Sequence, residues 1–270
     1  MKWVDLNGVA LRYATSGTAG PAVVLVHEMG GSLESWDGVI RHLPDTVRTL
    51  RFDLRGSGLS EKIAGRARMG DLVADVAGLL DVEGIAEPVV VVGCAAGAAV
   101  AVAFAALRPE RTAGIVGFAP AFGIQGAFRA GRLEELDRVE TEGQRSIADG
   151  MLAKVYPEPL RAVDRDRFES YRARWISTDP HGFAALSRML FDLTLDDYLP
   201  DVRCPALMVA GLHDPLRPPD FVRTLSRHIA GCEFVEVESG HFMHVQSPEL
   251  VAAAIERFRR NDASARKEAP

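Results

Sequence analysis

The sequence has few cysteines, and its charge balance is mildly acidic. Three cysteines in 270 residues, none in a Cys-x-x-Cys pair or near a histidine at ligand spacing, argue against a disulfide framework and a metal site. They predict three buried, reduced thiols in a cytoplasmic protein. The 37 acidic residues exceed the 31 Lys and Arg, for a formal net charge of −6, which argues against a nucleic-acid partner.

Long apolar runs are also missing. No run approaches about 18 residues, so we expect no transmembrane helix and no membrane partner. The first residues, Met1 to Asp5, lack the apolar stretch of a signal peptide, which agrees with a cytoplasmic location. The composition, 47% hydrophobic and 25% charged, is that of an ordinary globular protein and excludes disordered and fibrous classes.

Strand and helix patterns alternate along most of the chain. Short apolar runs predict eight strands, and segments with apolar residues at helical spacing lie between most of them. The predicted strands are 3–6, 9–13, 22–26, 48–52, 89–92, 113–118, 206–210 and 233–237. This rhythm predicts an α/β fold in which a mostly parallel eight-stranded sheet is covered by helices on both faces.

The middle of the chain has a different character. Residues 123–200 contain no buried strand pattern and are rich in charged residues at helical spacing, which predicts a helical insertion over the sheet. Its expected helices are 132–139, 146–155, 165–175 and 183–191. We therefore expect a core made of residues 1–122 and 201–260, a cap of residues 123–200 and a flexible polar tail at 261–270.

The most informative stretch runs from Val89 to Leu107. Four consecutive valines predict a strand buried on both faces, and the run from Ala98 to Leu107 predicts a helix. Between them, Gly93-Cys94-Ala95-Ala96-Gly97 has the Gly-x-x-x-Gly spacing of a nucleophile elbow, in which glycines let strand and helix approach closely. The central position, which holds a nucleophile in such turns, is Ala95.

Five motifs in order resemble the α/β-hydrolase superfamily, in particular capped members similar to 3-oxoadipate enol-lactonases. They are His27–Gly31, Asp53–Ser60, Gly93–Gly97, Gly211–Pro215 and Gly240-His241. Each stands at the carboxyl end of a predicted strand, where open α/β sheets carry their active sites. The loop from Asp53 to Ser60 is interpreted as structural.

The resemblance implies roles for several residues. His241 corresponds to the general base and Asp214 to the acid that orients it, while His244 is a neighbour outside the Ser-Gly-His pattern. The backbone N–H groups of Met29 and Ala96 would form the oxyanion hole. A small-molecule substrate is implied, with no metal and no organic cofactor; whether the chain forms a homo-oligomer is left open.

Further residues are candidates for substrate binding. Glu28 stands where the family more often has glycine; it either turns to solvent or pairs with an arginine, or else acts as a second acid/base or substrate-orienting group. In the insertion, Arg129, Arg132, Arg172 and Arg174 could clamp a substrate carboxylate, although surface solvation is the better explanation for any one of them. His27 is interpreted as a structural histidine.

Ala95 leaves three hypotheses. The first is a hydrolase of an ester, lactone or amide bond in a small, carboxylate-bearing molecule, inactivated by loss of its serine. The second is a naturally serine-free, cofactor-free enzyme that uses His241 and Asp214 as a general-base dyad. The third is a non-catalytic protein that binds a small molecule. Cys94 replaces the nucleophile in none of them, because on the strand side of the turn its side chain is expected to point into the sheet.

Overall fold

The computed structural model describes residues 1–63, 65–124, 126 and 128–268, with side chains to Arg260. Its centre is one eight-stranded sheet with the order β1-β2-β4-β3-β5-β6-β7-β8. Only the β1–β2 and β2–β4 pairs are antiparallel, so the predicted mostly parallel sheet is confirmed. The strands are β1 (Lys2–Leu6), β2 (Val9–Ser16), β3 (Ala19–Val26), β4 (Val47–Phe52), β5 (Val89–Cys94), β6 (Thr112–Phe118), β7 (Ala206–Gly211) and β8 (Glu233–Val237).

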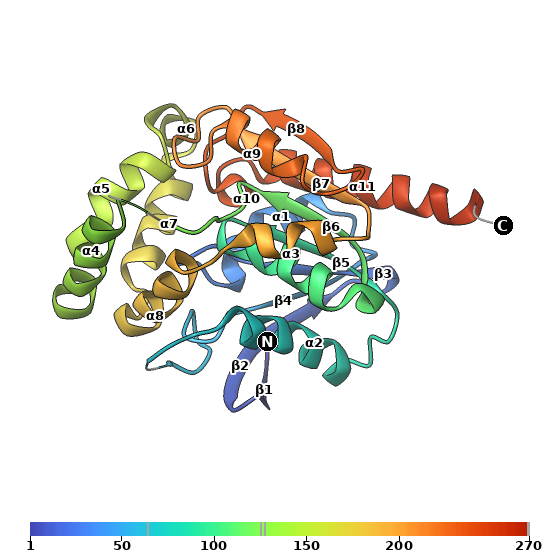
Figure 1. Ribbon diagram of the computed structural model, residues 1–270, viewed down its shortest axis with the longest axis horizontal. Helices are drawn as coiled ribbons and strands as arrows, with labels where there is room; N and C mark the ends of the chain where they lie inside the picture. The colour runs from blue at the N-terminus through green and yellow to red at the C-terminus, as the bar shows by residue number, and fades with distance from the viewer. Residues whose placement is uncertain (64, 125, 127, 269–270) are drawn as a thin grey trace.

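The sheet is buried at its centre because helices cover both faces (Figure 1). Every residue of β5, β6 and β7 is buried, which explains their unbroken runs of apolar residues. Helices α2 (Met69–Val82), α3 (Ala96–Leu107) and α9 (Pro219–Ser226) pack on one face, and α1 (Asp37–His42) and α11 (Pro248–Glu268) pack on the other. Alternate valines of β5 therefore enter two separate cores.

A helical cap occupies the connection between β6 and β7 and lies at one end of the molecule in Figure 1. Its helices are α4 (Phe128–Glu142), α5 (Arg145–Val155), α6 (Glu158–Val163), α7 (Arg165–Ile176) and α8 (Pro180–Phe191). Four of these were expected; α6 was missed because it is six residues long, begins after Pro157 and contains Pro159, so its sequence resembles a turn. Aromatic side chains of α7, among them Tyr171 and Trp175, join the cap to the core.

Two smaller expectations need correction. Residues 261–268 of the expected tail belong to the last helix, which continues to Glu268 through a segment rich in helix-forming Ala, Arg, Lys and Glu; residues 269–270 lie outside the described part. None of the three cysteines forms a disulfide, and only Cys94 is buried, whereas Cys204 and Cys232 are partly exposed. Among the described residues, none of the helices combines the length and apolar character needed to cross a bilayer.

Candidate active site

The turn between β5 and α3 has the strained geometry of a nucleophile elbow. Ala95 has φ 51° and ψ −110°, a conformation that L-residues rarely adopt, and its side chain is only 5% exposed. A Cβ atom on Gly97 would lie 2.0 Å from the carbonyl oxygen of Val26, and one on Gly93 would lie 2.1 Å from Gly97. Both glycines are therefore required for the close approach of strand and helix.

A carboxylate–imidazole pair lies beyond the carboxyl ends of β7 and β8. Asp214 follows β7, His241 follows β8, and Oδ2 of Asp214 lies 2.7 Å from Nδ1 of His241. Both side chains are buried, with residue exposures of 3% and 6%. The other oxygen of Asp214 accepts hydrogen bonds from the backbone N–H groups of Leu216, at 2.8 Å, and Arg217, at 3.1 Å.

The surroundings keep this carboxylate ionised. Burial alone would raise the pKa of Asp214, but the neighbouring imidazole of His241 and the two backbone N–H donors outweigh it and lower that pKa. With Nδ1 of His241 held by Asp214, Nε2 is the ring nitrogen left to exchange a proton. The pair therefore has the arrangement of a general base and its orienting acid.

The pocket above the elbow lies between the core and the cap and has an empty volume of about 780 Å³, its open mouth included. Ala95, Ala96, Met29 and His241 all line it, so the structure brings the predicted elbow, oxyanion and base positions together. Met29 and Ala96 have no hydrogen bond from their backbone N–H groups to any described residue, and Ala96 is the first residue of α3, where such donors are free. The remaining wall is mostly apolar and comes from the cap, including Trp175, Phe183, Phe191, Leu136, Ile147 and Met151.

Comparisons with known proteins agree with this geometry. A family model described as the alpha/beta hydrolase fold matches residues 21–248. The chain belongs to the α/β-hydrolase fold family. It is 26% identical over 261 residues to 3-oxoadipate enol-lactonase 2 of Acinetobacter baylyi, covering 92% of both chains.

Solved structures include a malate-bound thermophilic esterase of Thermogutta terrifontis, with a TM-score of 0.91, 29% identity, and coverage of 97% of this chain and 99% of that one. The enol-lactonase of Burkholderia xenovorans LB400 matches with a TM-score of 0.89 and 26% identity, covering 95% and 99%.

Among the expected arginines, only Arg132 lines the pocket of this α/β hydrolase, where it forms an ion pair with Glu135. Arg129 lies outside the lining residues and bonds to the carbonyl oxygen of Phe191, at 2.9 Å, and to Asp192. Arg172 also lies outside, paired with the exposed Asp149 at 2.9 Å. The structure thus does not bring Arg129 and Arg172 to the pocket.

Arg217 was not predicted, yet it lines the pocket. Its guanidinium donates to the backbone carbonyl oxygens of Pro120, Phe122 and Leu216 at 2.7–3.1 Å, and it has no carboxylate at ion-pair distance among the described residues. Burial lowers the pKa of Arg217; the charge of Asp214 opposes this effect, and the charge of Arg132 adds to it. Its position three residues after Asp214 was the only signal that the sequence offered.

Glu28 departs from both expectations. It neither faces solvent nor pairs with an arginine, and it is not among the residues that line the pocket. Its carboxylate is fully buried and lies 2.7 Å from Nε2 of His244. The reason is the position of the short helix α10 (Met243–Gln246), which places His244 beside the β3 end of the sheet; a partner 216 residues away left no local sequence signal.

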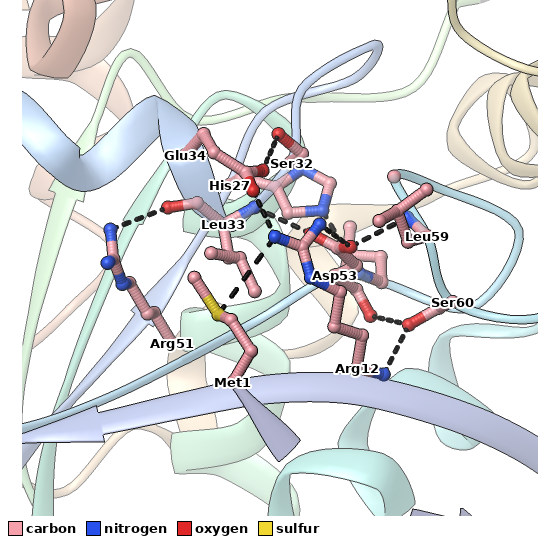
Figure 2. Close-up of polar contacts among 12 residues, drawn as sticks. Met1, Arg12, His27, Ser32, Leu33, Glu34, Arg51, Asp53, Leu59 and Ser60 are labelled. Carbon is pink, nitrogen blue, oxygen red and sulfur yellow. Dashed lines mark hydrogen bonds and ion pairs between the residues drawn. The ribbon is translucent and has the colours of Figure 1, made fainter. Parts of the chain in front are cut away.

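Structural roles account for His27 and for the loop after β4. His27 contacts the carbonyl oxygen of Glu28 through Nδ1 at 2.7 Å and accepts a hydrogen bond from the N–H of Leu54 through Nε2 at 3.0 Å. Figure 2 shows Asp53 at the centre of a network in which it accepts from the N–H groups of Leu33 and Leu59, both at 2.7 Å. These contacts use the side chains to hold loops, as the sequence predicted.

Cys94 is unsuited to act as a nucleophile towards a ligand in the pocket. It is fully buried beneath the pocket, outside the lining residues, and its Sγ lies 3.4 Å from the carbonyl oxygen of His241. Burial, followed by the nearby charges of Glu28 and Asp214, raises the pKa of its thiol well above the ordinary value. Within the described residues there is also no group of three or more His, Cys, Asp or Glu side chains that could hold a metal ion.

Proposed function

We propose that this α/β hydrolase cleaves small esters or lactones without forming an acyl-enzyme, with His241 activating the attacking water. The observation that carries the proposal is the buried pair of His241 and Asp214, 2.7 Å apart, beside a pocket whose nucleophile position is Ala95. A complete base and acid at this place have a purpose only if a proton is moved there. The 3-oxoadipate enol-lactonase and esterase relatives support esters or lactones as the substrate class.

The chemistry follows from the groups around Ala95. The oxygen of a water attacks the substrate carbonyl carbon while Nε2 of His241 takes one of its protons, and the imidazolium is stabilised by the carboxylate of Asp214. The resulting oxyanion would be held by the N–H groups of Met29 and Ala96, which do not depend on the side chain at position 95. Collapse of the tetrahedral intermediate expels the alkoxide, which recovers the proton from His241.

The cation Arg217 favours a substrate that carries a free carboxylate. Arg132 and Arg217 both line the pocket; Arg132 is paired with Glu135, which also lines it, whereas Arg217 has no acidic partner at ion-pair distance in the described structure. Its hydrogen bonds to three carbonyl oxygens leave some N–H groups of the guanidinium of Arg217 without an acceptor, and a guanidinium binds carboxylates through such N–H groups. The apolar cap wall would accommodate the rest of a small acyl group.

The test compares the chain with Ala95→Ser and His241→Ala on p-nitrophenyl acetate and an enol-lactone in stopped flow. The proposal expects steady turnover without a burst from the chain, a burst equal to the enzyme concentration from Ala95→Ser, and no turnover from His241→Ala. If the unchanged chain is inert and Ala95→Ser is active, the protein is instead a hydrolase that has lost its serine. This is the second candidate function, because the backbone at Ala95 keeps the strained conformation of a nucleophile turn. Inertness of both, with ligand binding, would identify a binding protein.

A further inference from the structure

A second carboxylate–imidazole pair, Glu28 and His244, lies in the core beneath the oxyanion loop. Oε2 of Glu28 is 2.7 Å from Nε2 of His244, and both residues are 0% exposed. Glu28 immediately precedes Met29, the expected oxyanion donor. His244 lies in α10, three residues after His241. The pair therefore joins two chain segments that each carry one part of the proposed catalytic machinery.

On the oxyanion side, the whole of Glu28 is held in place. Its second carboxylate oxygen accepts a hydrogen bond from the hydroxyl of Ser35 at 3.0 Å, and its carbonyl oxygen accepts one from the N–H of Gly31 at 3.1 Å. A Cβ atom on Gly31 would lie 2.4 Å from the carboxyl carbon of Glu28, so glycine makes room for this side chain. Met29 lies between these fixed points.

On the base side, packing fixes His244 as firmly. Its ring lies 4.6 Å from that of Trp36, and α10 continues directly from Phe242, whose carbonyl oxygen accepts hydrogen bonds from Val245 and Gln246. The carbonyl oxygen of His241 is in contact with Cys94. A displacement of His244 would therefore be transmitted to the backbone that carries His241.

The cap also meets this pair. The hydroxyl of Tyr171, from α7, is buried near the carboxylate of Glu28; burial, followed by that carboxylate, raises the pKa of Tyr171 well above the ordinary value. Burying such charges is costly, and apolar side chains of similar volume often stabilise a core as well or better. Stability alone is thus a weak reason for this pair, whereas a need for one defined arrangement of loops is a strong one.

We propose that Glu28 and His244 are positioning residues of the active site: their contact holds the Met29 N–H at a fixed position relative to the imidazole of His241. Neither touches the substrate, because neither lines the pocket. The inference rests on the proposed function for its kinetic consequence, but its structural claim, that the two loops are coupled, can be tested without turnover.

The kinetic test uses Glu28→Gln and His244→Phe, with Asp75→Asn as the matched control. Asp75 is equally buried and is bound by Arg55 at 2.6 and 2.7 Å, but neither of them lines the pocket. We expect kcat to fall about 10- to 100-fold in both variants with KM changed less than twofold, since small misplacements of catalytic groups have effects of this size. In the double variant, kcat should fall no further than in the more impaired single variant, because both changes break the same contact. Asp75→Asn should lower Tm but leave kcat unchanged.

The structural test uses NMR to measure whether a substitution in one of the two segments changes resonances of the other segment. We expect His244→Phe to shift the backbone amide resonance of Met29 in protein labelled with 15N-methionine, and Glu28→Gln to shift the ring resonances of His241 in 15N-histidine protein. If the chain shows no hydrolysis, the kinetics are repeated in the Ala95→Ser background, so a failed proposed function is told apart from a failed positioning role. Unmoved resonances with unchanged kcat and a lowered Tm would overturn the inference and leave a purely structural ion pair.

Discussion

The orienting acid offers the sharpest test of the proposed base. In Asp214→Asn, the side-chain oxygen must remain where Oδ1 is, because it accepts from the N–H groups of Leu216 and Arg217. The new NH₂ group then faces Nδ1 of His241, at the position now 2.7 Å away. Nδ1 has to accept instead of donate, so the proton of a neutral ring moves to Nε2 and the base is lost.

The expected loss follows from this change of tautomer. An Asp-to-Asn change with intact geometry lowers kcat about 10⁴-fold in a serine-protease triad, and we expect about 10³- to 10⁴-fold here, equivalent to about 4–5.5 kcal/mol of transition-state stabilisation. The assay is kcat/KM for the enol-lactone in the chain or, if that is inert, in Ala95→Ser. Glu238→Gln is the control, since Glu238 pairs with the surface residue His213 on the same side of the sheet and should leave the rate unchanged. A rate for Asp214→Asn within tenfold of the parent would refute the assignment.

Three further predictions follow from the contacts described. Gly97→Ala places a Cβ 2.0 Å from a backbone oxygen and should lower the free energy of unfolding by about 3 kcal/mol or more in urea melts, whereas Gly131→Ala, with open space around it in α4, should raise it by about 1 kcal/mol. Burial raises the pKa of Glu28, but the adjacent His244 outweighs burial and lowers that pKa from 4.5 to about 2. The ionised carboxylate therefore stabilises the fold above pH 4.5, and about 3 kcal/mol of the free energy of unfolding is lost as the pH falls towards 2. Acid unfolding of Glu28→Gln should lack this pH-dependent loss. Arg217→Gln should raise KM about 10- to 100-fold for an ester bearing a free carboxylate but not for p-nitrophenyl acetate, and Arg129→Gln, outside the pocket lining, should change neither value.

The features that the sequence predicted well are those with local causes. The valines of β5 indicate a strand buried on both faces, and Gly93 and Gly97 indicate a turn that tolerates no Cβ, as the distances to their neighbours confirm. In each, a few adjacent residues carry the whole physical reason for the structure.

The features that escaped prediction depend on contacts between distant segments. Glu28 and His244 are 216 residues apart, and neither segment alone indicates that a buried carboxylate has a partner. The pocket wall is similar: Arg132 of α4 and Arg172 of α7 both belong to charged cap helices, yet only Arg132 lines the pocket, because tertiary packing decides which face of a helix meets the pocket. For the same reason, the only local signal for Arg217 was its position three residues after Asp214.

The strain at position 95 bears directly on what the active site does. A non-glycine residue at φ 51° costs on the order of 1–3 kcal/mol and persists only where its surroundings impose it. Here they do, because the N–H of Ala95 donates to Phe118 and its carbonyl oxygen accepts from Ala121, both at 2.9 Å. The strained backbone is thus a property of the whole strand–helix junction and does not depend on a polar side chain at position 95. In the proposed mechanism this backbone would direct the Ala96 N–H into the pocket, since an oxyanion hole is needed whether the attacking oxygen belongs to serine or to water.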